Sequence, residues 1–240
     1  MTYRLYYWPT LPGRGELARL ILEDAGADYV DVARLPEDQG GGFPAILRFY
    51  EGEVEGAPVF APPILEVGDL RLAQTHVICA YLGEALGLAP VETEDRLVAR
   101  QHHLTLLDLV DEAHDVHHPL GASLYYDDQK DAAKLRAEQF ATSRLPRFLA
   151  HFERVLERGG AWFVGDACSY VDLTAFQVVE GLAYAFPNAF REASKAAPRL
   201  LALRDRVAGR PNVASYLASE RRLSFNEDGI FRHYPELDGA

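Results

Sequence analysis

The stretch YRLYYWPTLPGRGELARLILEDAG, residues 3–26, decides how the first part of the chain folds. An aromatic-rich extended run leads into a turn of proline and glycine, and apolar residues then recur at helical spacing over about 15–25. Gly26 follows this helix at the position where a left-handed residue is favoured. Tyr7 stands at the end of the expected strand. Because ligands of α/β units bind at strand ends, this side chain is placed to do chemistry.

The alternation of strands and helices continues beyond this first unit. A second strand is expected over 28–35, and a loop with three consecutive glycines follows it. Two short extended runs joined by Gly68-Asp69 form a strong hairpin signal, and a helix is expected over 74–86. This order predicts a small α/β domain over residues 1–86.

The remainder of the chain is dominated by the helical period, so a second, all-helical domain is predicted over 94–240. Residues 87–94 are the expected linker. Proline and glycine divide the second domain into helices near 94–118, 130–157, 170–184, 190–208 and 211–219.

Composition and charge exclude several function classes. The 240 residues are 48% hydrophobic, which supports a sizeable core, and 36 acidic against 24 basic side chains give a formal net charge of −12. Nucleic acids and anionic membrane surfaces need clustered Lys and Arg, so neither is an expected partner. Cys79 and Cys168 form no C-x-x-C motif and are expected to be buried thiols. No signal peptide or membrane helix is evident, and a cytoplasmic location is predicted.

Two further features lie near the hairpin. Pro62-Pro63 precedes an extended run, and a cis bond there would turn the backbone of the preceding residue outward to pair with an extended peptide ligand. An ordinary proline turn is the alternative. Gln74-Thr75 opens the helix that follows, with Thr75 as the expected N-cap. The free N–H groups of a helix start can receive a carboxylate, and a plain structural cap is the alternative.

Taken together and in this order, these features resemble the cytosolic glutathione S-transferases of the tyrosine type, the alpha, mu, pi and sigma group. The similarity is strongest over 3–26 and 63–87. In the second part it rests on FVGD at 163–166, on SYVD at 169–172 and on RPNVASYL at 210–217. The SYVD segment resembles the buried capping box of that family, in which Ser and Asp satisfy the first N–H groups of a helix.

The resemblance implies a thioredoxin-like first domain, a C-terminal helical bundle and a homodimer. It also implies an enzyme that conjugates the glutathione thiolate to small hydrophobic electrophiles, with a role in detoxification and no metal. Tyr7 matches the catalytic tyrosine of the family. A free thiol has a pKa of about 8.5, and a tyrosine hydroxyl that donates a hydrogen bond to sulfur favours the thiolate.

The resemblance also implies a set of residues that bind glutathione: Tyr7, Arg14, Arg48, Pro62, Pro63, Gln74 and Thr75. Gln74 and Thr75 match the pair that holds the γ-glutamyl carboxylate. Pro62 stands before the expected cis-proline, where it offers a carbonyl but no N–H. The Trp and Lys that grip the glycine carboxylate in the family have no clear counterpart, and Arg48 is the nearest basic residue.

A histidine cluster near the end of the first helix of the helical domain has three readings. His114 and His118 lie on one helical face, and Tyr125 follows in the next loop. The spacing suits a metal site, a solvated helix face or a wall of the second-substrate pocket. The resemblance implies the last of these, with His114, His118 and Tyr125 lining the pocket.

Two other functions remain open at this stage. A non-catalytic relative could keep the fold and bind apolar ligands or a partner, and a glutathione-dependent isomerase or peroxidase would use the same site.

Overall fold

The computed structural model describes residues 2–121 and 123–239. The chain forms two compact units, Met1–Ala89 with Arg210–Ser224 and Pro90–Gly209 with Phe225–Ala240. The sequence-based division differs in one segment, because 210–224 was assigned to the helical domain and packs with the first unit instead. Ion pairs and hydrogen bonds to the first helix of the first unit hold this segment there, as described below.

A four-stranded mixed sheet in the order β2-β1-β3-β4 forms the centre of the first unit. The strands are β1 (Tyr3–Tyr6), β2 (Tyr29–Asp31), β3 (Ile64–Val67) and β4 (Leu70–Ala73). β2 runs parallel to β1, whereas β3 pairs antiparallel with both β1 and β4. The helices of this unit are α1 (Gly15–Asp24), α2 (Pro44–Tyr50), α3 (Thr75–Ala85) and α10 (Pro211–Leu217). This is the thioredoxin-like architecture that the sequence predicted.

Neighbouring residues of β1 face opposite sides of the sheet. Tyr6 is buried in a cluster with Ile46 and Phe49 of α2, whereas the ring of Tyr7 lies against the start of α1. α1 packs in turn against α3 and α10. The alternation along β1 therefore separates two adjacent tyrosines into two different environments.

Two elements of the first unit differ from the sequence prediction. The second strand ends at Asp31, because Val32 and Ala33 turn inward as a 3-10 helix and join the cluster around α2. α2 lies where a loop was expected. Pro44 is its first residue, and its length of seven residues is too short for the helical period to stand out after a run of glycines.

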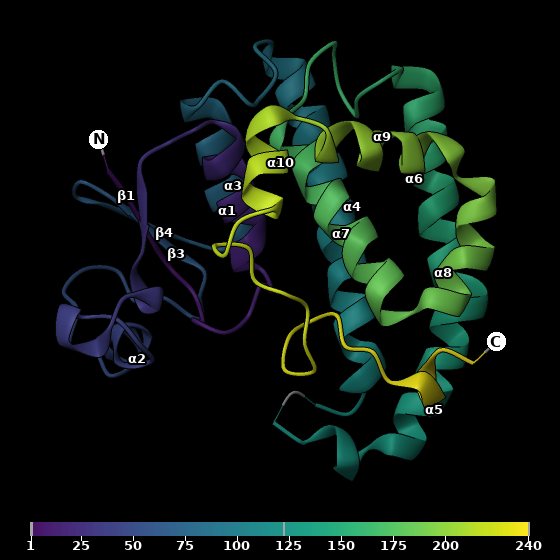
Figure 1. Ribbon diagram of the computed structural model, residues 1–240, viewed down its shortest axis with the longest axis horizontal. Helices are drawn as coiled ribbons and strands as arrows, with labels where there is room; N and C mark the ends of the chain where they lie inside the picture. The colour runs from purple at the N-terminus through teal and green to yellow at the C-terminus, as the bar shows by residue number, and fades with distance from the viewer. Residues whose placement is uncertain (1, 122, 240) are drawn as a thin grey trace. The chain divides into compact units, whose positions relative to one another are not determined.

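The regular elements in the described part of the second unit are all helices, as predicted. Its helices are α4 (Thr93–His117), α5 (Lys130–Gln139), α6 (Leu145–Gly159), α7 (Tyr170–Ala185), α8 (Pro187–Ala193) and α9 (Pro198–Ala208). α7 is the central helix and packs against α4 and α9 (Figure 1). Within the described part of the chain, no helix has the length and apolar character needed to span a membrane.

Two of the predicted helices are interrupted. The segment expected at 130–157 contains a π-helical turn, Phe140–Arg144, between α5 and α6. The segment expected at 190–208 is divided at Pro198, because proline lacks the N–H that a continuous helix needs.

The predicted capping box at the start of α7 is confirmed. The Asp172 carboxylate accepts hydrogen bonds from the Ser169 N–H at 2.8 Å, the Ser169 hydroxyl at 2.8 Å and the Phe163 N–H at 2.9 Å. The Ser169 hydroxyl oxygen in turn accepts the Val171 N–H at 3.3 Å. These groups are buried, so their donors have no access to water and depend on this carboxylate.

We expect Asp172→Ala to lower the free energy of unfolding by about 1–2 kcal/mol, because it leaves buried N–H groups without acceptors. Urea unfolding followed by circular dichroism measures this change. Ser143→Ala, an exposed serine in the π-helical turn, is the control and should leave the unfolding midpoint in place. Equal midpoints for both variants would contradict the capping role.

Candidate functional site

The register of the sheet brings three predicted site residues to one edge. Tyr6 is paired with Ile64, so the next residues along the two antiparallel strands, Tyr7 and Pro63, lie opposite each other. Ile64 is also paired with Ala73 of the antiparallel strand β4. Gln74, which follows Ala73, therefore lies opposite Pro63 on that side. Residues that are far apart in the sequence therefore meet where β1 ends, β3 begins and β4 ends.

Tyr7 is held by the turn that follows it. Its hydroxyl oxygen accepts a hydrogen bond from the Arg14 N–H at 3.0 Å, and the side chain is only 6% exposed. Burial raises the pKa of Tyr7, and the Arg14 N–H together with the charges of Arg14 and Arg19 works against this rise. The hydroxyl therefore keeps its proton at neutral pH. Since its oxygen is already an acceptor, the proton is free to be donated to a ligand.

Gly13 is required by this close packing. It has a φ of +41°, and a Cβ at this position would overlap the Tyr7 hydroxyl. A larger residue would displace the ring from the turn that orients it.

Gln74 and Thr75 form the second part of the site. Gln74 has a φ of +71° and is the non-glycine residue with a positive φ in the described part of the chain. Backbone strain of this kind clusters at binding sites. The expectation that Thr75 is the N-cap is wrong: Gln74 occupies that position, and Thr75 is the buried first residue of α3. The exposed Gln74 and the first N–H groups of α3 nevertheless lie together beside β3.

The peptide bond between Pro62 and Pro63 is cis. Pro62 has a carbonyl but no N–H, so a peptide ligand could receive only one backbone hydrogen bond from it.

Arg48 lies on the Tyr6 side of the sheet and contacts Tyr6 and Phe49. Its Nη2 donates to the Tyr6 hydroxyl at 3.3 Å, and its guanidinium carbon lies 5.5 Å from the Tyr6 ring centroid and 5.3 Å from that of Phe49. The helical period of α2 turns Arg48 toward Tyr6, which faces the opposite side of the sheet from Tyr7. Its predicted contact with the glycine carboxylate stays a prediction.

The three residues predicted for the second-substrate pocket belong to the second unit. The rings of His114 and His118 are stacked, with centroids 5.1 Å apart and planes at 19°. Tyr125 lies on the surface and is 82% exposed. Sequence reasoning did not single out His117, although it follows His114 by three residues. Its Nδ1 is 2.5 Å from the Nδ1 of His118, and its Nε2 lies 2.8 Å from the Ile230 carbonyl oxygen.

The histidine pair is neutral at physiological pH. Burial and the charge of Arg232 lower the pKa of His117 to about 3 and that of His118 to about 4. A neutral imidazole has one donor and one acceptor nitrogen. His117 can therefore donate from Nε2 to the Ile230 carbonyl and accept at Nδ1 from the Nδ1–H of His118.

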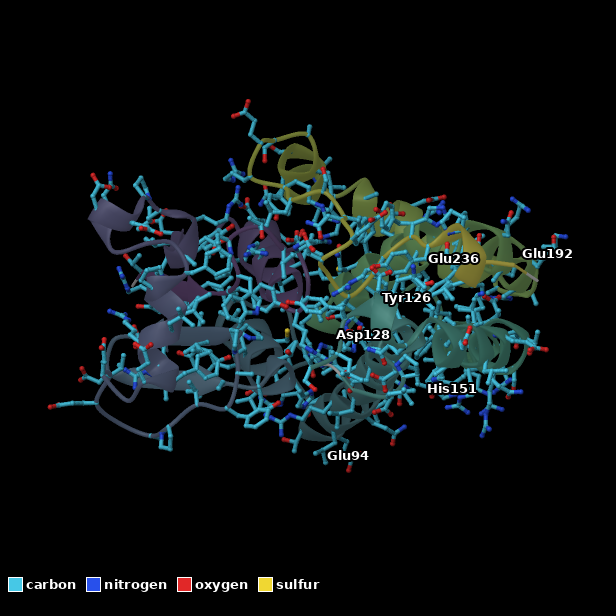
Figure 2. All side chains as sticks on the ribbon, turned by 90° about the horizontal axis from the view of Figure 1, so that it is seen from below. Glu94, Tyr126, Asp128, His151, Glu192 and Glu236 are labelled. Atoms are coloured by element: carbon cyan, nitrogen blue, oxygen red, sulfur yellow. The ribbon has the colours of Figure 1, made fainter. Side chains whose placement is uncertain are left out.

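The C-terminal segment that carries Ile230 is anchored to the second unit further along. The rings of Tyr126 and Tyr234 are stacked, with centroids 4.0 Å apart. The Tyr126 hydroxyl donates to Glu236 at 3.0 Å, and these two residues lie side by side in Figure 2. The Asp238 carboxylate accepts hydrogen bonds from the N–H groups of Asn188 and Ala189 in the first turn of α8.

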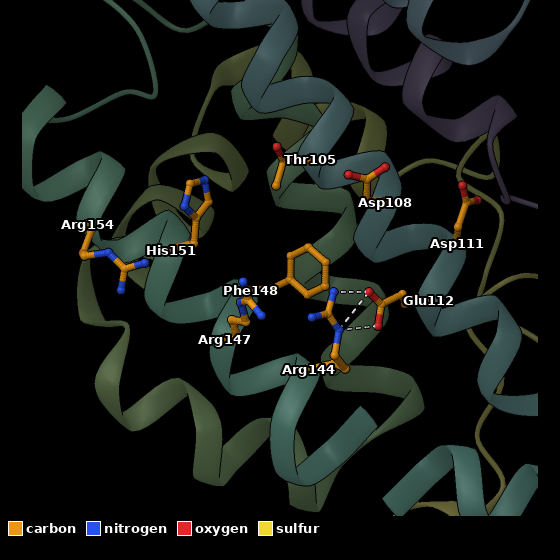
Figure 3. A pocket seen from close by; sticks show the side chains of 9 residues that line it. All are labelled: Thr105, Asp108, Asp111, Glu112, Arg144, Arg147, Phe148, His151 and Arg154. Carbon is orange, nitrogen blue, oxygen red and sulfur yellow. Dashed lines mark hydrogen bonds and ion pairs between the residues drawn. The ribbon is translucent and has the colours of Figure 1, made fainter. Parts of the chain in front are cut away.

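A hollow of about 570 Å³ lies between α4 and α6 of the second unit (Figure 3). Its α4 wall carries acidic residues, its α6 wall carries basic ones, and Arg144 of the π-helical turn is paired with Glu112 at 2.5 Å. None of the predicted site residues is among its lining residues. No group of three or more His, Cys, Asp or Glu side chains within 2–121 and 123–239 could hold a metal ion.

Comparisons with known proteins agree with the fold. Residues 114–220 match the family model of the glutathione S-transferase C-terminal domain. The chain is 26% identical over 211 residues to the glutathione S-transferase of Plasmodium yoelii yoelii, which covers 87% of this chain and 90% of that protein. It is 26% identical over 224 residues to glutathione S-transferase P 1 of Xenopus laevis, with 92% and 93% covered. The structure of prostaglandin synthase D of Nilaparvata lugens has a TM-score of 0.71 at 19% identity, with 92% and 98% covered.

The fold defines a protein with an α/β unit of thioredoxin-like architecture, in which Tyr7 follows the first strand, and a second unit whose regular elements are helices in the described residues. The relatives span both units, and the family model matches most of the helical one. The chain is similar to glutathione S-transferases over most of its length, as the sequence indicated.

The histidine pair makes the stability of the protein depend on pH. In the unfolded chain both residues have a pKa of about 6.5, so the unfolded state takes up protons at a higher pH than the folded state. We expect the free energy of unfolding to be largest above about pH 6.5 and to fall as the pH is lowered toward about 4. His118→Asn should reduce this slope in urea unfolding at a series of pH values. An unchanged slope would contradict the assignment.

Proposed function

We propose that this protein is a glutathione transferase that conjugates the glutathione thiolate to small hydrophobic electrophiles. The observation that carries the proposal is the Tyr7 hydroxyl, whose oxygen is held by the Arg14 N–H while its proton stays available. The relatives named glutathione S-transferase support the activity, and they do not favour a non-catalytic protein or an isomerase or peroxidase.

Tyr7 acts on the thiol by favouring its anion. A hydrogen bond to a charged group contributes about 1.5–3 kcal/mol, which corresponds to about 1–2 units of thiol pKa. Lowering a thiol pKa from about 8.5 by two units makes the thiolate the main form at pH 7. Tyr7 does not need to remove a proton, because its neutral hydroxyl only has to bind S⁻ better than SH.

The rest of glutathione would lie along the edge of the sheet. The Pro62 carbonyl accepts the N–H of the cysteinyl residue, as in the addition of an extended strand. The γ-glutamyl carboxylate binds at Gln74 and Thr75, where the first N–H groups of α3 and its dipole favour negative charge. Arg14 and Arg48 are proposed to support the remaining charge of the ligand. The binding of the glycine carboxylate by Arg48 would require its side chain to leave Tyr6.

The second substrate would be bound by the helical unit. His114, His118 and Tyr125 offer ring surface for a hydrophobic electrophile. We further propose that the protein works as a homodimer in the cytoplasm, as the resemblance to its family implies.

Tyr7→Phe is the direct test of the activity. It should lower kcat/KM for conjugation of a generic aromatic electrophile by about 10- to 100-fold at neutral pH, because the sulfur loses its donor. Tyr6→Phe is the matched control on the same strand. Its hydroxyl donates to Glu66 on the other face of the sheet, so its loss should affect stability and leave kcat at saturating glutathione nearly unchanged. The proposed activity fails if the unaltered protein does not conjugate glutathione, and the role of Tyr7 fails if Tyr7→Phe conjugates at the same rate as the unaltered protein.

Thr75→Val tests the carboxylate site. Valine matches threonine in shape and lacks its hydroxyl, so the Kd for glutathione should rise by about tenfold. Thr75→Ser keeps the hydroxyl and should bind nearly as well. Isothermal titration calorimetry with glutathione measures both, and equal affinities for the two variants would exclude the role of this hydroxyl.

A further inference from the structure

Arg19, in the middle of α1, is the largest fully buried side chain of the described chain. Its Nε donates to Asp31 at 2.6 Å, and its Nη1 lies 3.3 Å from a carboxylate oxygen of Glu16. Both the Arg19 and the Glu16 side chains are 0% exposed. A buried cation is costly unless carboxylates surround it, so a reason is needed for placing three charges here.

The remaining contacts of Arg19 point to the turn beneath Tyr7. Nη1 also donates to the carbonyl oxygens of Leu11 and Pro12, each at 3.3 Å. These two residues lead directly into Gly13 and Arg14, whose N–H is bonded to the Tyr7 oxygen. The guanidinium carbon lies 5.8 Å from the centroid of the Tyr7 ring. Arg19 thus contacts both the ring and the turn that orients its hydroxyl.

We propose that Arg19 is a positioning residue for Tyr7, because its guanidinium fixes the 11–14 turn in the shape that presents the Arg14 N–H to the Tyr7 oxygen. The inference rests on the proposed glutathione transferase activity and deepens it. With the turn in place, the oxygen of Tyr7 is occupied and its proton is directed to the thiol. With the turn released, the same hydroxyl can rotate, and its bond to the thiolate weakens.

The network also includes the C-terminal segment of the first unit. The Tyr216 hydroxyl donates to Glu16 at 2.7 Å, and Arg222 is paired with the same oxygen. Glu16 is therefore held from α10 on one oxygen while its other oxygen faces Arg19. The segment 210–224 thus braces the carboxylate that keeps Arg19 in place.

Arg19→Lys is the informative variant. Lysine keeps the charge that Glu16 and Asp31 require, but its single ammonium cannot reproduce the planar fork that serves the carboxylates and the two carbonyls together. We expect the apparent pKa of bound glutathione to rise by about one unit, measured from kcat/KM between about pH 5.5 and 9 and from thiolate absorbance in the ultraviolet. Relative to the unaltered protein, kcat/KM should be about tenfold lower at the acid end of this range and equal at the alkaline end. The KM for glutathione should change little, because its anchors lie on β3, β4 and α3.

Arg210→Lys is the matched control. Arg210 forms a two-pronged pair with Asp24 on the same helix, with both bonds at 2.7 Å, and Asp24 lies outside the Arg19 network. This variant should lower the unfolding midpoint and leave the pH profile unmoved. Tyr216→Phe, which removes one donor from Glu16, should move the profile in the same direction as Arg19→Lys by a smaller amount. It replaces Arg19→Lys if that variant does not fold.

The proposal is overturned if these variants keep the pH profile of the unaltered protein, or if they lose activity equally at every pH. Its failure is distinguishable from that of the proposed function. If Tyr7→Phe loses activity and Arg19→Lys keeps its profile, only the role of Arg19 is wrong. If Tyr7→Phe retains full activity, the roles of Tyr7 and Arg19 both fall while the transferase assignment stands, and that assignment falls if the unaltered protein does not conjugate glutathione.

Discussion

The hydrogen bond from the Arg14 N–H to the Tyr7 oxygen is the contact on which the account of this protein depends. It makes the phenolic oxygen an acceptor and so leaves its proton for a ligand. The contact requires a tight turn, which Gly13 permits because it has no Cβ to overlap the ring. It also requires Tyr7 to follow β1 directly, since one residue earlier the side chain faces α2 instead.

A network of buried charged side chains in the first unit lies next to the 11–14 turn that holds Tyr7. The network consists of Arg19 with its two carboxylate partners, Glu16 and Asp31. Glu16 is also bound by Tyr216 and Arg222 of the segment 210–224. Replacing a buried ion network with apolar residues is often neutral or stabilising. Stability alone therefore does not account for these charges, whereas the directional bonds from Arg19 to the turn do. The same contacts help to hold 210–224 on the first unit, together with the pair between Arg210 and Asp24.

Much of the fold could be predicted from local signals. The Gly68-Asp69 turn located the hairpin, and the helical period located α1, α3, α4 and α7 within a few residues. The capping box at Ser169 was also visible, because its spacing is fixed by the first turn of a helix. α2 was missed since seven residues give too few repeats of the period, and the π-helical turn before Leu145 leaves no such signal.

The sequence located the residues of the candidate site that lie at strand ends, but it did not predict the contacts that depend on tertiary packing. Strand pairing brings Tyr7, Pro63 and Gln74 together, and this follows once the hairpin register is known. The attachment of Arg48 to Tyr6 depends on tertiary packing around α2, and the pairing of His117 with the Ile230 carbonyl joins residues far apart in the sequence. Neither contact has a local pattern that could have revealed it.

A crystal structure of the protein with bound glutathione tests the central claim most directly. We expect the sulfur to lie within about 3.5 Å of the Tyr7 oxygen, this oxygen still to accept the Arg14 N–H, and the tripeptide to extend along Pro62 toward Gln74. A sulfur bound elsewhere, with the Tyr7 hydroxyl turned into the protein, would contradict it.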